Sequence, residues 1–130
     1  MNREYGKWIG EMNWDYFITV RKNYRVSKKG IRRLIEKLGH QVQSSSIIER
    51  MFIVGERDFD DMENYHTHLL INTPIGQKDI ESFLRKTLGE KDNIHTEPVI
   101  DNTSVGIYLS KFLDKDIEYD IYQNTKTLQL

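Results

Sequence analysis

The sequence predicts an α+β fold with an antiparallel sheet, in the ferredoxin-like order βαββαβ. Segments rich in β-branched and aromatic residues alternate with segments whose apolar residues recur at helical spacing. The 130 residues suffice for one hydrophobic core, and no tract rich in proline or glycine divides them. We therefore expect a single domain over residues 1–130, with its core at about 14–113 and a polar C-terminal tail. Two helices would pack on one face of the sheet and leave the other face for a site.

Composition predicts the strands, and apolar spacing with end signals predicts the helices. The aromatic and β-branched segment Trp14–Val20 is typical of a strand. Ser27 is a typical N-cap for a helix that ends near Gly39. The other predicted elements are strands over Ile47–Glu56, His66–Asn72 and Asn93–Ile100, a helix over Gln77–Leu88, and a short helix from Asn102 or Thr103 to about Leu113. The following residues alternate only weakly, at Ile117, Tyr119 and Ile121.

The composition excludes several kinds of site. The chain has no cysteine, which rules out disulfides, thiolate metal sites and a cysteine nucleophile. Any metal would have to be held by histidine and carboxylate groups, which suit hard or borderline divalent ions. No apolar run approaches the roughly 20 residues of a membrane helix, and the first residues lack a signal-peptide pattern. We therefore expect a cytoplasmic protein, in the host cytoplasm if it is viral, with no membrane partner.

The near-neutral net charge of −1 hides two segments of opposite sign. Residues 1–50 carry 11 Lys or Arg and five Asp or Glu, whereas residues 51–130 carry eight and 15. Much of the positive charge lies between Arg21 and Lys37, and much of the negative charge lies between Glu56 and Glu63. The first segment would suit a polyanion and the second a cation, although either could be an ordinary solvated face.

The segment Tyr65–Ile71 contains two histidines separated by one residue. Side chains alternate in a strand, so His66 and His68 would share one face and Thr67 would point to the other. If the second and third strands form a hairpin, an obvious register places Glu56 opposite His66 and Val54 opposite His68. Two imidazoles and a carboxylate can hold a divalent ion and leave positions open for substrate. Glu49, Asp58 and Glu63 compete with Glu56 for the third position, and such a pair also occurs on surfaces without metal.

A second group of candidate residues lies on the last predicted helix. Tyr108 and Lys111 are three apart, which places them on one helix face. A phenol with a pKa near 10 is a poor nucleophile at neutral pH, and a nearby cation or metal would favour its phenolate. Tyr119 and Tyr122 are rival nucleophiles, but neither has a lysine at the matching spacing.

The two histidines and the Tyr108–Lys111 spacing together resemble the HUH endonucleases, in the form of the single-tyrosine initiators of rolling-circle replication. The resemblance runs from about Trp14 to Phe112; Thr67 departs from it, because the residue between the histidines is usually bulky and hydrophobic. It implies His66, His68 and Glu56 as ligands of Mn²⁺ or Mg²⁺. It also implies Tyr108 as the nucleophile that forms a 5′-phosphotyrosine and Lys111 as its charged helper. Phe112 occupies the position of the second tyrosine found in some relatives, which indicates a single-tyrosine enzyme.

The resemblance further implies partners and a role. The protein would nick and join single-stranded DNA at an origin site or hairpin of a virus, phage or plasmid. Helicase or replication proteins of the host or virus would assist it, and a homodimer is allowed. Cations interleaved with an aromatic residue suit a single strand, and the residues predicted to contact DNA are Thr19, Arg21, Lys22, Tyr24, Arg25, Lys28 and Lys29.

Two other readings remain open. A single-tyrosine HUH transposase has a similar size, although such transposases more often carry glutamine where Lys111 stands. A non-catalytic ferredoxin-like nucleic-acid-binding protein would bind single strands without metal and form no covalent adduct.

Overall fold

The computed structural model describes residues 1–113, 115 and 117–124. It has an α+β fold, with a five-stranded antiparallel sheet in the order β4-β1-β3-β2-β5. The strands are β1 (Tyr16–Arg21), β2 (Arg50–Arg57), β3 (Tyr65–Asn72), β4 (Asn93–Pro98) and β5 (Glu118–Gln123). The helices are α1 (Arg3–Gly10), α2 (Lys28–Ser44), α3 (Gln77–Thr87) and α4 (Asn102–Ser110). The ferredoxin-like prediction is confirmed, with β5 added at the edge beside β2.

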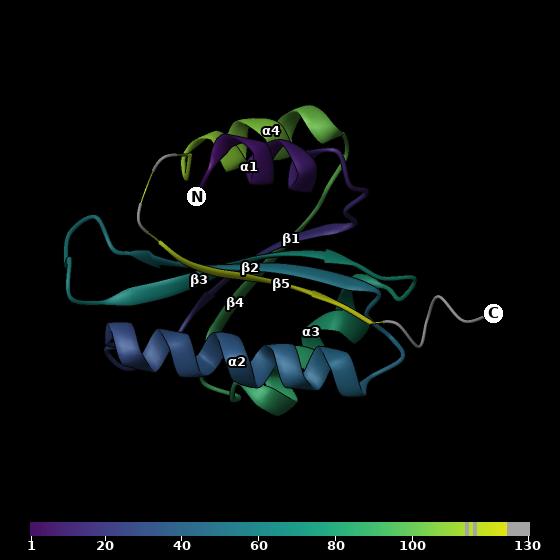
Figure 1. Ribbon diagram of the computed structural model, residues 1–130. Helices are drawn as coiled ribbons and strands as arrows, with labels where there is room; N and C mark the ends of the chain where they lie inside the picture. The colour runs from purple at the N-terminus through teal and green to yellow at the C-terminus, as the bar shows by residue number, and fades with distance from the viewer. Residues whose placement is uncertain (114, 116, 125–130) are drawn as a thin grey trace.

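Helices cover both faces of the sheet, which corrects the prediction of helices on one face only. Figure 1 shows α2 and α3 on one face and α1 and α4 on the other. One core lies beneath α2 and α3 around residues such as Leu69 and Ile71, and a second lies beneath α1 and α4 around Phe52 and Leu70. Both faces need cover because the strand residues Met51–Val54 are all apolar and fully buried, instead of alternating with polar residues.

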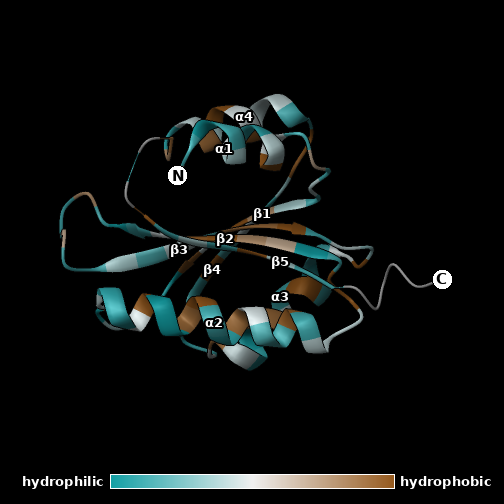
Figure 2. Ribbon diagram, in the orientation of Figure 1, coloured by the Kyte–Doolittle hydropathy of each residue, from teal (hydrophilic) through white to brown (hydrophobic). Residues whose placement is uncertain are grey.

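Hydropathy follows this layered arrangement. Figure 2 shows hydrophobic residues in the central strands and on parts of α2, with hydrophilic residues over much of the rest of that helix. None of the helices in the described part of the chain is long and apolar enough to span a membrane.

Several predicted boundaries were wrong for identifiable reasons. The helix α1 was not predicted; the Asn2 side chain caps it by accepting from the backbone nitrogen of Tyr5 at 2.7 Å. The helix α2 continues to Ser44, because Gly39 does not end it but provides space for the ring of Tyr122. Asp101 caps α4 in place of Asn102 or Thr103, and that helix ends at Ser110. The predicted C-terminal tail after residue 113 contains the strand β5, and the part of it beyond residue 124 lies outside the described residues.

The register of the β2–β3 hairpin was predicted correctly. Glu56 pairs with His66 and Val54 pairs with His68. On the other side of β3, Thr19 of β1 pairs with His68. The hairpin loop is closed by the backbone nitrogen of Asp58, which donates to the carbonyl of Asn64 at 2.9 Å. This hairpin places both histidines at one end of the sheet.

Candidate metal centre and tyrosine site

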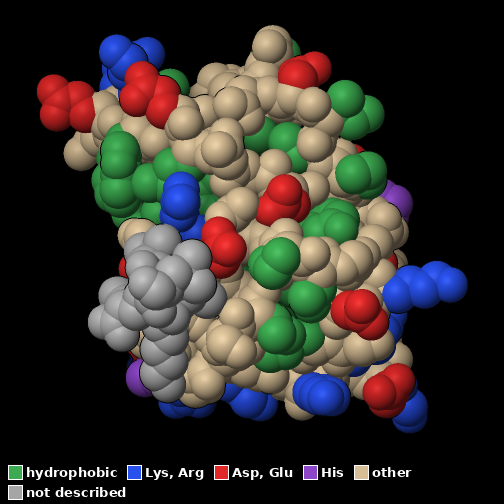
Figure 3. Space-filling view, turned by 90° about the vertical axis from the view of Figure 1, so that its right-hand side faces the viewer, with side chains coloured by type: hydrophobic (Ala, Val, Ile, Leu, Met, Phe, Trp, Pro, Cys, Tyr) green, Lys and Arg blue, Asp and Glu red, His purple; other side chains and the backbone are tan. Residues whose placement is uncertain are grey.

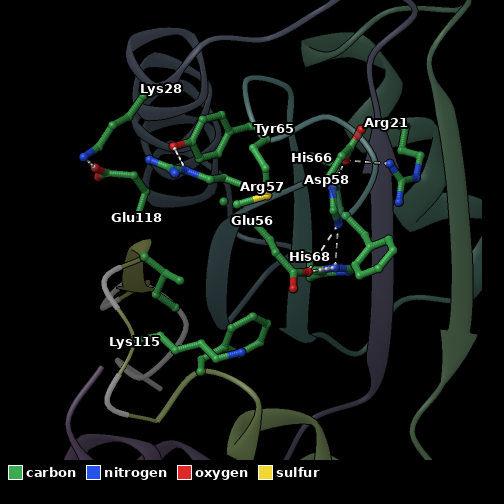
Figure 4. Close-up of a pocket in the computed structure, with 15 residues that line it drawn as sticks. Arg21, Lys28, Glu56, Arg57, Asp58, Tyr65, His66, His68, Lys115 and Glu118 are labelled. Carbon is green, nitrogen blue, oxygen red and sulfur yellow. Dashed lines mark hydrogen bonds and ion pairs between the residues drawn. The ribbon is translucent and has the colours of Figure 1, made fainter.

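Three side chains from the β2–β3 hairpin converge on one point. The Nε2 atoms of His66 and His68 lie 3.1 Å apart, and Oε2 of Glu56 lies 3.3 Å from the first and 2.9 Å from the second. Figure 4 shows these three side chains pointing toward one another. Within the described residues this is the group whose ligand atoms could hold a metal ion.

The spacing of these atoms fits a small divalent ion. Nitrogen and oxygen ligands held at about 2.1 Å from an ion lie about 3.0 to 3.4 Å from one another in octahedral or tetrahedral geometry. The three separations observed span 2.9 to 3.3 Å. Three protein ligands would also leave coordination positions open for further ligands. Glu56 is therefore better placed than its rivals, of which Asp58 contacts His66 through the other ring nitrogen and Glu63 lies near Arg25.

The second ring nitrogen of each histidine also has a partner. Nδ1 of His66 lies 2.5 Å from Oδ1 of Asp58, and Nδ1 of His68 lies 3.1 Å from Oγ1 of Thr19. Such contacts fix the tautomer and ring orientation of a metal-binding histidine. Thr19, which the sequence placed on the DNA surface, thus orients His68. The sequence indicates Asp58 only as a direct ligand, although its position two residues after Glu56 is consistent with a place on the same face.

Asp58 also joins the hairpin to β1. Nη1 of Arg21 donates to Oδ1 of Asp58 at 2.9 Å, and Nδ2 of Asn64 donates to Oδ2 at 2.8 Å. Burial raises the pKa of Asp58, but hydrogen bonds from Asn64, His66 and Arg21 outweigh it and lower the pKa below its ordinary value. Asp58 therefore stays ionised, and it can hold the Nδ1 hydrogen of His66.

Glu56 is held in its carboxylate form by the two histidines. Hydrogen bonds to His66 and His68 lower its pKa well below the ordinary value, against the opposing effect of burial. An ionised carboxylate is the form that binds a metal ion. The centre is therefore ready to bind a cation at neutral pH without first losing a proton from Glu56.

Tyr108 of α4 lies next to this centre. Its ring centroid is 5.7 Å from that of His68, 4.6 Å from that of Phe17 and 5.1 Å from that of Phe112. Its hydroxyl is buried and has no hydrogen-bond partner among the described residues. Burial, with a smaller effect of the charge on Glu56, raises the pKa of Tyr108 well above its ordinary value. A buried hydroxyl without a partner costs free energy, which a bound phosphate oxygen or metal would offset.

The rival tyrosines have other environments. The ring of Tyr119 packs against Tyr5 and Phe52, with centroids 5.6 and 6.2 Å away. The ring of Tyr122 lies against Gly39 on the α2 face of the sheet. Of the three candidate tyrosines, Tyr108 has the ring contact with a histidine of the metal centre.

A cavity of about 770 Å³ opens beside the metal centre. Both histidines, Glu56 and Asp58 line it, as do cations from four different segments. Lys111, the predicted helper of Tyr108, is exposed at the C-terminal end of α4 and does not line this cavity. Lys115 does line it, and Figure 4 shows its side chain extending toward the cavity from the segment between α4 and β5.

The predicted basic DNA surface is divided in the structure. Arg21 and Lys28 line the cavity, whereas Tyr24 and Lys29 are exposed away from its lining. Lys22 is not available to DNA: its side chain is 9% exposed, and Nζ donates to Asp92 at 2.6 Å and to the carbonyl of Leu88 at 3.0 Å.

Arg25 is paired with the acidic hairpin loop. Its Nη2 lies 2.6 Å from Oδ1 of Asp61 and 3.7 Å from Oε2 of Glu63. The basic and acidic segments of the sequence therefore contact each other, instead of forming separate surfaces for a polyanion and a cation.

The remaining histidines are not ligands of this centre. His95 shares the cross-strand row of Thr19, but it is largely exposed and lies 2.9 Å from Glu97. His40 is exposed on α2. Figure 3, which views the end of the molecule turned away from the hairpin, shows histidine only at its margins.

Comparisons with known proteins support the fold alone. The chain matches no family model and no curated protein sequence. It is similar in structure to the hypothetical protein ORF119 from Sulfolobus islandicus rod-shaped virus 1, with a TM-score of 0.51 and 19% sequence identity. The similarity covers 89% of this chain and 96% of that protein.

Proposed function

We propose that this protein is a metal-dependent endonuclease that nicks and joins single-stranded DNA through a covalent 5′-phosphotyrosine on Tyr108. The observation that carries the proposal is the convergence of His66 Nε2, His68 Nε2 and Glu56 Oε2 beside the ring of Tyr108. An ion-binding trio, a tyrosine and a cavity lined by cations are the parts that such a reaction needs.

His66, His68 and Glu56 would hold Mn²⁺ or Mg²⁺, and Thr19 and Asp58 would keep the two imidazoles oriented. The ion supplies Lewis acidity toward the oxygens of the scissile phosphate. Arg21, Lys28, Arg57 and Lys115 line the cavity and are placed to bind the phosphates of the strand. The raised pKa of Tyr108 means that the free protein holds its nucleophile as a neutral phenol.

The strand transfer itself is written with Tyr108 as the attacking group. Its phenolic proton passes to a water molecule that enters with the strand, and Oη forms a bond to phosphorus. The bond from phosphorus to the 3′ oxygen breaks, and that oxygen takes up a proton to become a free 3′-OH. The reverse attack by a 3′-OH on the phosphotyrosine rejoins the strand, because phenolate is a workable leaving group.

Initiation of replication of a virus, phage or plasmid is the role we infer for this chemistry. It rests on the spacing of Tyr108 and Lys111. Transposition by the same single-tyrosine chemistry is the alternative role, and it would use the same site residues. The two roles differ in the DNA that is joined, which sequencing of the trapped strand identifies.

The test is a covalent adduct assay. The protein is incubated with a pool of labelled single-stranded oligonucleotides, in Mn²⁺ or in EDTA, and run on a denaturing gel. We expect a slow, metal-dependent band that disappears in Tyr108→Phe and persists in the matched control Tyr119→Phe. A band that survives Tyr108→Phe would assign the nucleophile elsewhere. DNA binding that ignores EDTA and leaves no band with any oligonucleotide would favour the non-catalytic binding protein.

A further inference from the structure

The tip of the β2–β3 hairpin presents apolar side chains to solvent beside the metal centre. Phe59 is fully exposed and Met62 is 59% exposed, and both line the cavity. Hydrogen bonds hold the loop that carries them: Asn64 donates its backbone nitrogen to the carbonyl of Asp61 at 3.0 Å, and Arg25 donates to the Asp61 side chain at 2.6 Å. The ring of Phe59 is therefore exposed to solvent on a loop whose position is fixed by hydrogen bonds.

The charges around the same cavity favour an anionic ligand. Its cations outnumber its carboxylates and come from β1, α2, the end of β2 and the segment before β5. The cations are Arg21, Lys28, Arg57 and Lys115, and the carboxylates are Glu56, Asp58 and Glu118. Two of the cations are partly neutralised, since Arg21 pairs with Asp58 and Lys28 lies 3.9 Å from Glu118. A divalent ion on the hairpin would add two further positive charges.

We propose that the single strand crosses this cavity and that Phe59 stacks on one of its bases, next to the scissile phosphate. The inference rests on the proposed function for its choice of DNA as the ligand. Cations that follow a phosphate backbone, combined with an exposed aromatic ring on which a base can stack, are the features of single-strand binding sites. Phe59 lines the same cavity as His66 and His68, so a base on its ring would share that cavity with the candidate metal centre.

This assignment gives base stacking to Phe59 and not to Tyr24, the aromatic residue among those that the sequence predicts to contact DNA. Tyr24 is exposed, but it does not line the cavity, and Nζ of Lys22 lies 5.2 Å from the centre of its ring. The ring of Phe59 has no such partner in the described part of the chain.

The test compares a normal strand with a strand that lacks bases. Fluorescence anisotropy is measured in EDTA and low salt with labelled oligothymidylate and with an abasic strand of equal length. We expect Phe59→Ala to weaken binding of oligothymidylate about 5- to 100-fold and to leave binding of the abasic strand unchanged. Ile100→Ala is the matched control, since Ile100 is 90% exposed and does not line the cavity. Phe59→Trp should preserve the binding.

A cross-link locates the contact directly. Oligothymidylate with 5-iodouracil in place of thymine is irradiated with the wild-type protein, and mass spectrometry should find the cross-link on Phe59. Equal affinities of wild type and Phe59→Ala for oligothymidylate, equal losses on both strands, or a cross-link on Tyr24 instead would each overturn the proposal.

These measurements separate the base site from the nuclease. Because EDTA removes the metal ion, they do not require cleavage. If Phe59→Ala loses affinity only for the strand with bases and no Tyr108 adduct forms, the base site is supported and the proposed nuclease is contradicted. If an adduct forms in Mn²⁺ and Phe59→Ala does not change the affinity for either strand, the nuclease is supported and the base site is contradicted.

Discussion

His68 makes a different contact through each of its ring nitrogens. Nε2 faces His66 and Glu56, and Nδ1 lies 3.1 Å from the hydroxyl of Thr19. With Nε2 bound to an ion, Nδ1 carries the hydrogen and the Thr19 oxygen accepts it. The neighbouring strand β1 would therefore set the orientation of this imidazole toward a bound metal ion.

Loss of the Thr19 hydroxyl should weaken metal binding. We expect Thr19→Val, which has nearly the same shape, to lower the affinity for Mn²⁺ about 10- to 100-fold, because partners of this kind orient metal-binding histidines. Thr19→Ser keeps the hydroxyl and should bind nearly as well as the wild type. Calorimetric titration with Mn²⁺ measures both variants, and an unchanged affinity in Thr19→Val would show that Thr19 does not orient His68.

Tyr108→Phe should leave the protein at least as stable as the wild type at pH 7. The hydroxyl it removes is buried without a partner, so little favourable energy is lost. Urea denaturation gives the free energy of unfolding. A loss of more than about 1.5 kcal/mol, the usual net worth of a hydrogen bond, would indicate that the hydroxyl has a partner after all.

The same variant should change the dependence of stability on alkaline pH. The folded protein raises the pKa of Tyr108 above the value near 10 of the unfolded chain, so the folded state retains the proton longer. The stabilisation is complete below about pH 10 and is lost as the pH rises from there toward the folded pKa. Tyr5 and Tyr122, whose pKa values are also raised, contribute in the same direction. Tyr108→Phe should therefore lose less stability between pH 9 and 11 than the wild type, as urea titrations at each pH would measure.

At the scale of elements, the β2–β3 hairpin explains why part of the site could be predicted. Glu56, His66 and His68 lie on two adjacent strands, so alternation and one register sufficed to place them together. The DNA surface could not be predicted in this way. The ion pairs of Lys22 with Asp92 and of Arg25 with Asp61 join segments far apart in the chain, and no local pattern specifies them. The contact of Thr19 with His68 could not be predicted either, since the two residues lie 49 positions apart.

The packing of α2 on β5 makes a helix glycine necessary. A methyl group at Gly39 would overlap the ring of Tyr122, so Gly39→Ala should destabilise the protein by about 1 to 3 kcal/mol. This loss would exceed the gain of about 1 kcal/mol in helix propensity. Gly106 of α4 is the matched control, because a methyl group there meets nothing within 4 Å, and Gly106→Ala should stabilise by up to about 1 kcal/mol. Urea denaturation compares the two, and an equal gain in both would contradict the packing argument.

At the scale of the whole molecule, the sheet is enclosed by two helical layers. The sequence predicted the ferredoxin-like plan, but the α1–α4 layer was missed as a cover. The helix α1 precedes the first strand and depends on contacts with α4, so its own short sequence gave little evidence of it. That layer packs Tyr108 and Phe112 against the sheet. The position of Tyr108 therefore depends on packing between α4, α1 and the strands, and not on local sequence alone.

Binding of a metal ion should stabilise the whole domain. A ligand that binds only the folded state at 100 times its dissociation constant adds about 2.7 kcal/mol to the free energy of unfolding. We expect Mn²⁺ to raise the melting temperature of the wild type, EDTA to reverse this, and His68→Ala to abolish it. Calorimetric melting of the three samples measures the effect, and an equal rise in His68→Ala would place the ion elsewhere.

The residues of the proposed reaction come from two separate parts of the chain, the β2–β3 hairpin and α4. The three proposed ligands lie within one hairpin, at positions 56 to 68, whereas the proposed nucleophile lies 40 residues after the last of them. A hairpin closes quickly and needs only local contacts, while the docking of α4 must wait for the strands and helices between. The three hairpin residues can therefore come together before Tyr108 reaches them. Under the proposed function, cleavage of DNA would therefore require a chain in which α4 has docked on the sheet.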